Sequence, residues 1–259
     1  MEEPGIKRNS LINNFIVRSV LGRLNSNIEH YGFANSFKRI LDYGSRKMEI
    51  QRDPEVFRVL SEEPVLLITN HPSETDALVL LGCMPQKENV FIIIAHVFLN
   101  LLPAFDKHCI PVYIDYRAEK DITYDFLLKI NPSPIYTEEE SKVLNKESIK
   151  VIAQKIHEGG LVIFAPGYGN DDKEFKTGLG HILNLLPEPE KVRIVMTYIR
   201  NTSKFDYLRI LPYVGKLLPR FRIAFSPAAF AKDFVSGDVK ADTVSLQNHY
   251  HTWVRSLIT

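Results

Sequence analysis

A histidine and an aspartate stand close together after an apolar run, in the stretch VLLITNHPSETDALVLLG that begins at residue 65. His71 precedes Asp76 where a predicted strand passes into a predicted helix. A neutral imidazole at such a place can take a proton from an attacking hydroxyl. A carboxylate on the first turn of the next helix can fix the ring's tautomer and stabilise the imidazolium that forms. The pair is therefore a candidate general base with its supporting acid.

The same residues also fit an ordinary helix start. Ser73, Glu74, Thr75 and Asp76 match the capping-box pattern, with Ser73 at the N-cap and Asp76 at the third helical position. The helix dipole favours an acid there, and a hydrogen-bonded structural role is the default for a single histidine. Taken alone, this stretch leaves both interpretations open.

Strand-like and helix-like segments alternate from residue 65 onward. The predicted strands are 65–69, 89–95, 109–115, 161–165, 192–199 and 221–226, and the predicted helices are 75–82, 146–157, 177–186 and 242–258. Buried apolar strands separated by helices indicate an α/β fold with a mixed, mostly parallel sheet flanked by helices. Sites in such sheets gather beyond the carboxyl ends of the strands. His71 and the loop APGYGND both follow predicted strands, so we expect them at that edge.

Three segments lie outside this alternation. Residues 11–24 are helical in composition, and 33–48 predict a basic amphipathic helix, suited either to an interface or to docking on its own domain. Residues 118–142 read as an insertion between two strands, either a lid or a surface excursion. We therefore predict an N-terminal helical segment over 1–58 and an α/β domain over 59–259.

The composition and charge of the chain restrict the classes of binding partner and the location that we expect. The chain of 259 residues has a net charge of +1, so no overall field favours nucleic acid. The first 52 residues carry nine Lys and Arg against five Asp and Glu, which predicts contact with an anionic membrane surface through residues 10–50. No run is apolar for the ~18 residues of a spanning helix, and no signal-peptide pattern opens the chain. With only two cysteines, we expect a cytoplasmic, peripherally membrane-associated protein.

Beyond the His71 stretch, further blocks follow in a recognisable order. They are IIIAHVFLNLLPAFDKHCIPVYIDYR, GGLVIFAPGYGNDDKEFKTGLGHI, VRIVMTYI and FRIAFSPAAF. Together with NHPSETD, these blocks resemble the glycerolipid acyltransferase family, whose first motif is a histidine followed after four residues by an aspartate. The resemblance runs from about residue 60 to 235. It implies an acyltransferase-like α/β fold and an O-acyltransferase activity in phospholipid and lipid metabolism.

The resemblance also implies roles for particular residues. His71 and Asp76 match the family's catalytic pair. The substrate-binding positions are Arg117, Gly167, Tyr168 and Lys176. Two positions depart from the family's third block, because Pro166 stands at the usual glutamate and Tyr168 at the usual threonine.

By this resemblance, His71 deprotonates an acceptor hydroxyl, which attacks the thioester of an acyl-CoA or acyl carrier protein, while Asp76 orients the ring. The partners are thus an acyl donor thioester and a lipid acceptor. No cofactor is expected beyond this co-substrate. No metal is expected either, since His249 and His251 point apart on a helix. Alternatives are a catalytically silent lipid- or acyl-binding homologue, a hydrolase, and an acyltransferase for a non-glycerophosphate acceptor. Acceptor, acyl length and oligomeric state stay undetermined.

Overall fold

The computed structural model describes residues 15–43, 48–73, 75–100, 102–114, 133–167, 174–203, 206 and 218–258. At its centre is an eight-stranded sheet with the order β1-β7-β6-β2-β5-β3-β4, and β8 pairs with β6 outside this path. The strands are β1 Met48–Gln51, β2 Val65–Thr69, β3 Val90–Ala95, β4 Cys109–Val112, β5 Leu161–Phe164, β6 Arg193–Arg200, β7 Phe221–Phe225 and β8 Ala229–Phe230.

The sheet is mixed and mostly parallel, which confirms the predicted fold class. β6, β2, β5, β3 and β4 are parallel neighbours, whereas β7 and β8 run antiparallel to β6. In the register of the central strands, Leu67 pairs with Ile163 on one side and Val195 on the other. Every residue of β2 is buried because helices cover both faces of the sheet, and this explains its unbroken apolar run.

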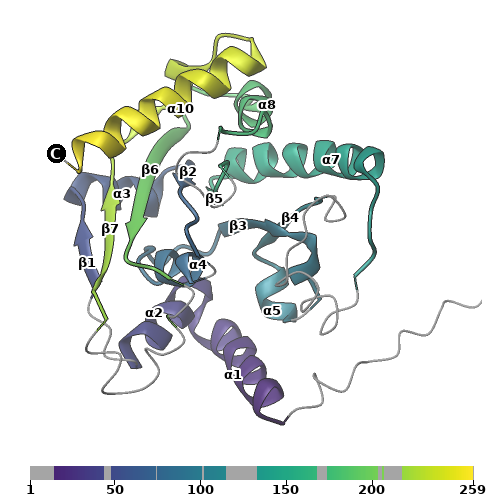
Figure 1. Cartoon of the computed structure of the whole chain (residues 1–259), viewed down its shortest axis with the longest axis vertical. Helices are drawn as coiled ribbons and strands as arrows, with labels where there is room; N and C mark the ends of the chain where they lie inside the picture. The colour runs from purple at the N-terminus through teal and green to yellow at the C-terminus, as the bar shows by residue number, and fades with distance from the viewer. Residues whose placement is uncertain are drawn as a thin grey trace, which may run out of the picture.

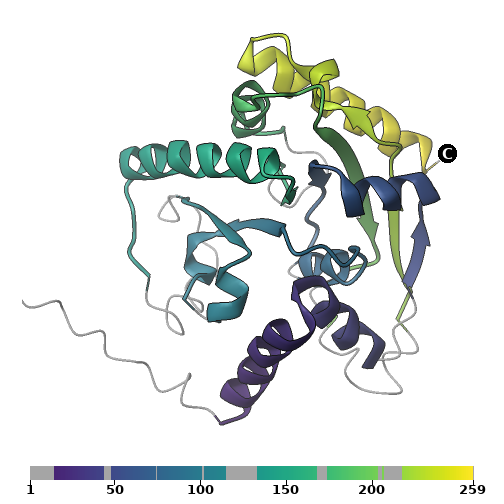
Figure 2. The ribbon, with the colours of Figure 1, turned by 180° about the vertical axis from the view of Figure 1, so that it is seen from behind.

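Two helical layers cover the sheet (Figures 1 and 2). The helices are α1 Phe15–Tyr31, α2 Phe33–Tyr43, α3 Pro54–Glu62, α4 Asp76–Leu81, α5 Pro103–Asp106, α7 Glu138–His157, α8 Gly178–Leu185 and α10 Val239–Ser256, with short 3₁₀ turns η1 His96–Phe98 and η3 Ala231–Phe234. Side chains from α1 to α5 form one hydrophobic core with one face of the sheet. Those from α7, α8 and α10 form the second core on the opposite face.

The amphipathic helix predicted over 33–48 is shorter than expected, because α2 ends at Tyr43 and Met48 opens β1. Its apolar face is buried in the first core. There the Phe33 ring stacks on His108 with centroids 4.2 Å apart. The apolar face of α2 therefore packs on the protein itself. β1 pairs with β7, so the sheet takes in residues that precede the predicted boundary at 58.

α7 begins earlier than predicted, at Glu138 rather than at residue 146. The Thr137 hydroxyl accepts from Glu140 N at 3.2 Å, and the Glu140 carboxylate accepts from Thr137 N at 2.8 Å, which makes a complete capping box. The acidic cluster at the end of the predicted insertion is thus the first turn of this helix, where the dipole favours acids. Residues 115–132 of that region lie outside the described residues.

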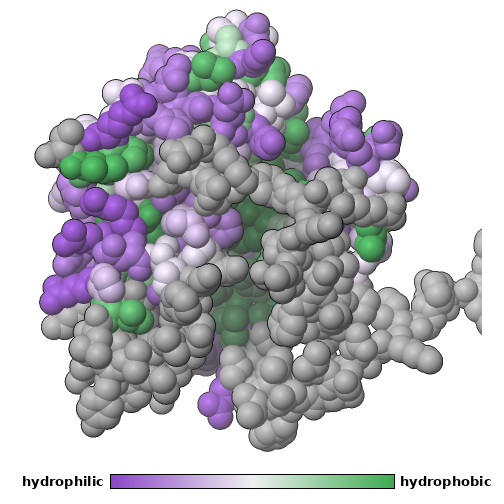
Figure 3. All heavy atoms as spheres, in the orientation of Figure 1, coloured by the Kyte–Doolittle hydropathy of each residue, from purple (hydrophilic) through white to green (hydrophobic). Residues whose placement is uncertain are grey.

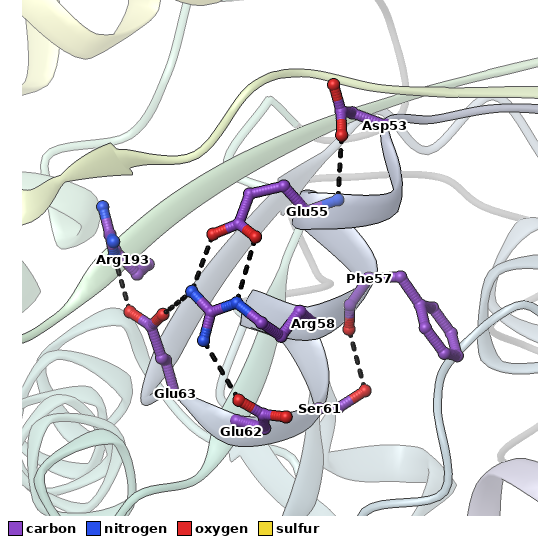
Figure 4. A network of polar contacts seen from close by, with 8 residues as sticks. All are labelled: Asp53, Glu55, Phe57, Arg58, Ser61, Glu62, Glu63 and Arg193. Carbon is purple, nitrogen blue, oxygen red and sulfur yellow. Dashed lines mark hydrogen bonds and ion pairs between the residues drawn. The ribbon is translucent and has the colours of Figure 1, made fainter.

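An ion-pair network joins α3 to the first residue of β6 (Figure 4). Arg58 donates to Glu55, Glu62 and Glu63 at 2.7–3.0 Å, and Glu63 accepts from Arg193 at 2.6 Å. Single exposed pairs of this kind contribute little. As a network they fix α3 against the amino ends of the parallel strands, which is the edge opposite to His71.

Candidate active site

The carboxyl ends of neighbouring parallel strands meet at one edge of the sheet. Asn70 and His71 follow β2, and Pro166 and Gly167 follow β5, its hydrogen-bonded neighbour. The predicted placement of His71 and the start of the APGYGND loop at this edge is therefore confirmed. This is where sites form in open α/β sheets.

Asn70 determines where the chain leaves the sheet. Its Nδ2 donates to Ile199 O at 2.9 Å, and its Oδ1 accepts from Ile199 N at 2.8 Å. The side-chain amide thus occupies the next rung after the backbone pair Thr69–Thr197. Because Asn70 is buried and both of its polar ends are satisfied, His71 begins at a fixed point on the rim.

His71 and Asp76 contact one another across the turn. His71 Nδ1 lies 3.2 Å from Asp76 Oδ2, and the same oxygen accepts from Ser73 N at 2.8 Å. The His71 side chain is 46% exposed, whereas that of Asp76 is 3% exposed. An ionised carboxylate only accepts hydrogen bonds, so the ring's proton lies on Nδ1 and Nε2 is left as the basic nitrogen. The arrangement is an accessible imidazole in contact with a buried carboxylate.

The predicted capping box is only half present. α4 begins at Asp76, and its N-cap is Thr75, which makes no side-chain cap hydrogen bond. Ser73 at the N-cap and Asp76 at the third helical position were therefore wrong by two residues. The reciprocal half does form, because the Asp76 carboxylate accepts the Ser73 N–H. Asp76 thus holds the turn and the imidazole with the same oxygen.

A second buried carboxylate adjoins this turn, and no sequence pattern singled it out. Asp206, 3% exposed, accepts a hydrogen bond from Thr75 Oγ1 at 2.6 Å. Its partner lies 131 residues away in the chain. One local signal was present, since Ser203 and Asp206 repeat the Ser-x-x-Asp spacing of Ser73 and Asp76.

The other predicted site residues are only partly placed. Gly167 is half-buried, and Lys176 is exposed. Lys176 N donates to Pro166 O at 3.1 Å, which closes the loop after β5 and keeps both of its ends at the edge where His71 lies. Arg117 and Tyr168 lie outside the described residues.

An aromatic cluster follows the ends of β3 and β4 along the same edge. The rings of His96, Tyr113 and Tyr136 lie with pairwise centroid distances of 5.1–5.2 Å, and His96 Nε2 is 3.1 Å from Pro134 O. Burial lowers the pKa of His96 below its ordinary value. His96 is thus a neutral packed ring and not a surface cation.

Neither cysteine is suited to nucleophilic chemistry. Burial raises the pKa of Cys83 to about 12 and also raises that of Cys109, so both are thiols at neutral pH. Among the described residues, no group of three His, Cys, Asp or Glu side chains could hold a metal ion. The His71–Asp76 contact at this edge is a histidine–carboxylate pair of the kind that general acid–base catalysis uses.

Comparison with known proteins identifies the family. The model of a family described as Acyltransferase matches residues 48–200, from the first residue of β1 to the last residue of β6. No curated protein matches the chain. The matched segment is more than half of the 259 residues and contains the His71 turn and the loop after β5. The chain belongs to the glycerolipid acyltransferase family and is an acyl-group transferase.

Proposed function

We propose that this protein transfers a fatty acyl group from a thioester, acyl-CoA or acyl carrier protein, to a hydroxyl of a glycerolipid or related lipid. His71 acts as the general base and Asp76 supports it. The observation that carries this assignment is the 3.2 Å contact between His71 Nδ1 and Asp76 Oδ2, with the ring accessible and the carboxylate buried.

The proton transfers follow from the tautomer of His71. Nε2 takes the proton of the acceptor hydroxyl as its oxygen attacks the thioester carbonyl carbon. The new C–O bond forms, the tetrahedral intermediate collapses, and the C–S bond breaks. The departing thiolate then takes the proton back from the imidazolium, which returns His71 to its starting state. Asp76 stabilises the imidazolium between these two transfers.

Substrate binding is proposed for Arg117, Gly167, Tyr168 and Lys176. Lys176 supports this because it is an exposed cation on the loop that closes beside β2. Figure 3 shows a recess with an apolar floor at the centre of one face, in the region of β3 and α4. An apolar recess next to the helix that carries Asp76 suits a fatty chain.

The acceptor need not carry a glycerophosphate. Pro166 stands where the family's usual residue is a glutamate, and a buried proline offers no side-chain donor or acceptor. This observation favours a second candidate, acyl transfer to a lipid alcohol without a phosphate. A parallel screen with lysophosphatidate and a monoacylglycerol distinguishes the two.

A peripheral membrane location through residues 10–50 is part of the proposal. The apolar face of α2 is buried, so this contact depends on exposed cations such as Arg23, Lys38 and Arg39. None of the described helices combines the length and apolar character that a membrane span requires. Flotation with vesicles of phosphatidylcholine alone or with phosphatidylglycerol tests the contact, and equal binding to both vesicles contradicts it.

The reaction is tested with palmitoyl-CoA and each acceptor, following free CoA with a thiol reagent and the new ester by mass spectrometry. His71→Ala should lower the rate by about 10²–10⁴-fold. His157→Ala is the matched control, because His157 is 48% exposed, lies 3.9 Å from Glu188 and precedes β5 at the opposite edge. A folded His71→Ala protein with the wild-type rate contradicts the assignment. Free fatty acid in place of a new ester indicates a hydrolase.

A further inference from the structure

Two turns of the same geometry meet beside His71. In the first, Ser73 N donates to Asp76 Oδ2 at 2.8 Å, and Ser73 Oγ lies 3.4 Å from Asp76 Oδ1. In the second, Ser203 N donates to Asp206 Oδ2 at 2.8 Å, and Ser203 Oγ lies 3.4 Å from Asp206 Oδ1. Each turn holds a carboxylate that is 2–3% exposed. Asp206 lies beyond residues 48–200, so the family match does not include it.

Thr75 connects the two turns. A carboxylate only accepts, so the Thr75 hydroxyl donates to Asp206 Oδ2 at 2.6 Å. The Thr75 oxygen can then accept from Ser73 Oγ, which is 2.9 Å away. Hydrogen bonds therefore lead from Asp206 through Thr75 to the Ser73 hydroxyl. The backbone N–H of Ser73 then donates to Asp76 Oδ2, the oxygen that contacts His71.

We propose that Asp206 is a positioning residue for acyl transfer, which holds the His71 turn through Thr75 and adds a second buried negative charge behind the imidazole. This inference rests on the proposed role of His71. Its geometric part follows from the short Thr75 contact, because the turn between β2 and α4 is thereby tied to the chain that follows β6. Its electrostatic part follows from burial, since a charge removed from water acts over a longer range.

The charge is tested without any substrate. The titration midpoint of the His71 ring is measured by NMR in the wild type, in Asp206→Asn and in a control, with His71→Gln used to assign the signal. Removing a negative charge disfavours the imidazolium, so Asp206→Asn should move the midpoint to lower pH, by roughly a few tenths of a unit.

Asp242→Asn is the matched control for this titration. Asp242 is also buried, at 1% exposure, and also accepts from a serine backbone, Ser236 N at 2.8 Å. It lies in the first turn of α10, where it also accepts from Asn184 near the end of α8, away from the turn that carries His71. Asp242→Asn should therefore leave the His71 midpoint unchanged. An equal midpoint in Asp206→Asn and the wild type overturns the electrostatic part of the proposal.

The hydrogen bond is tested with a pair of variants at Thr75. Thr75→Val removes the hydroxyl at nearly constant volume, and Thr75→Ser keeps it. With palmitoyl-CoA and the acceptor that gives a product, Thr75→Val should lower kcat by about 10-fold, with KM for palmitoyl-CoA within 2-fold, and Thr75→Ser should restore most of the rate. Wild-type kcat in Thr75→Val overturns the geometric part.

The two proposals fail in different ways. If the wild-type protein transfers no acyl group to any acceptor, the proposed function fails, and the NMR titration still decides whether Asp206 acts on His71. If transfer occurs and neither the midpoint nor kcat responds, Asp206 has only a structural role. Should Asp206→Asn not fold, the His71 midpoint is compared between Thr75→Val and Thr75→Ser, and identical midpoints with identical kcat count against the proposal.

Discussion

Replacing Asp76 with asparagine tests the charge of the buried carboxylate while keeping its shape. Asp76 Oδ2 accepts from Ser73 N at 2.8 Å and contacts His71 Nδ1 at 3.2 Å. An asparagine oxygen in the same place can accept both bonds. The substitution therefore removes mainly the negative charge that would face the imidazolium in the proposed proton transfer.

The expected loss follows from Coulomb's law. Two unit charges about 4 Å apart attract by roughly 1 kcal/mol in water and roughly 4 kcal/mol near a protein surface. The exposed His71 ring and the buried Asp76 carboxylate place this pair between those limits. Since about 1.4 kcal/mol corresponds to tenfold in rate, kcat/KM should fall by about 10- to 500-fold.

The assay is release of CoA from palmitoyl-CoA across the pH range of activity, with melting curves on the same samples. Asp76→Asn should move the acid limb of the rate profile to lower pH, because the imidazolium loses its nearest negative charge. A variant that melts like the wild type and keeps kcat/KM within 2-fold refutes the reasoning. Asp76 would then hold only the turn.

Three further predictions concern stability. Asn70→Ala leaves the buried Ile199 N–H and C=O without their side-chain partner, so the free energy of unfolding in urea should fall by about 2 kcal/mol. An unchanged free energy of unfolding would mean that these two hydrogen bonds do not stabilise the fold. Gly180→Ala puts a Cβ against a carbonyl of α10 and should cost about 1–3 kcal/mol, whereas Gly22→Ala, with open space around it, should not destabilise. Burial lowers the pKa of His96, so below about pH 6.5 the unfolded chain binds more protons than the folded protein does. The free energy of unfolding should therefore fall as the pH drops through that value, and it should fall less in His96→Gln. Equal pH dependence in both proteins contradicts this.

The central strands could be predicted because both faces of the sheet are covered. Residues 65–69 carry five apolar or half-apolar side chains in a row, and β2 has the predicted bounds. The same holds for 161–165, where β5 ends one residue earlier. Apolar runs of this kind reflect burial on two sides, and burial is what determines a strand's position in a parallel sheet.

β1 could not be predicted from its own residues. Met48–Gln51 is a four-residue edge strand. Met48 is partly buried, and the other three residues are exposed. Its partner β7 begins at Phe221, so the pairing depends on a contact between distant parts of the chain. Met48 and Ile50 do alternate with Glu49 and Gln51, but four residues are the shortest run in which alternation indicates a strand, and Met48 falls within the helix predicted over 33–48.

The candidate site likewise has one part that could be predicted from the sequence and one that could not. His71 and Asp76 are close in sequence, so a turn between a strand and a helix was enough to bring them together. Asp206 reaches Thr75 only because the end of β6 lies beside the end of β2. Its Ser-x-x-Asp spacing is local, but the contact is a property of strand order, which no single segment encodes.

The structural and catalytic interpretations of Asp76 are compatible, and this has a consequence for mutagenesis. One oxygen accepts from the Ser73 backbone and contacts the His71 ring, so any change that removes it loosens the turn and the base together. His71 contributes an exposed ring that the turn does not need for its own hydrogen bonds. Loss of stability and loss of rate should therefore be coupled in Asp76→Ala, which removes the oxygen, and separable in His71→Ala. A similar loss of stability in His71→Ala and Asp76→Ala would mean that the imidazole itself holds the turn.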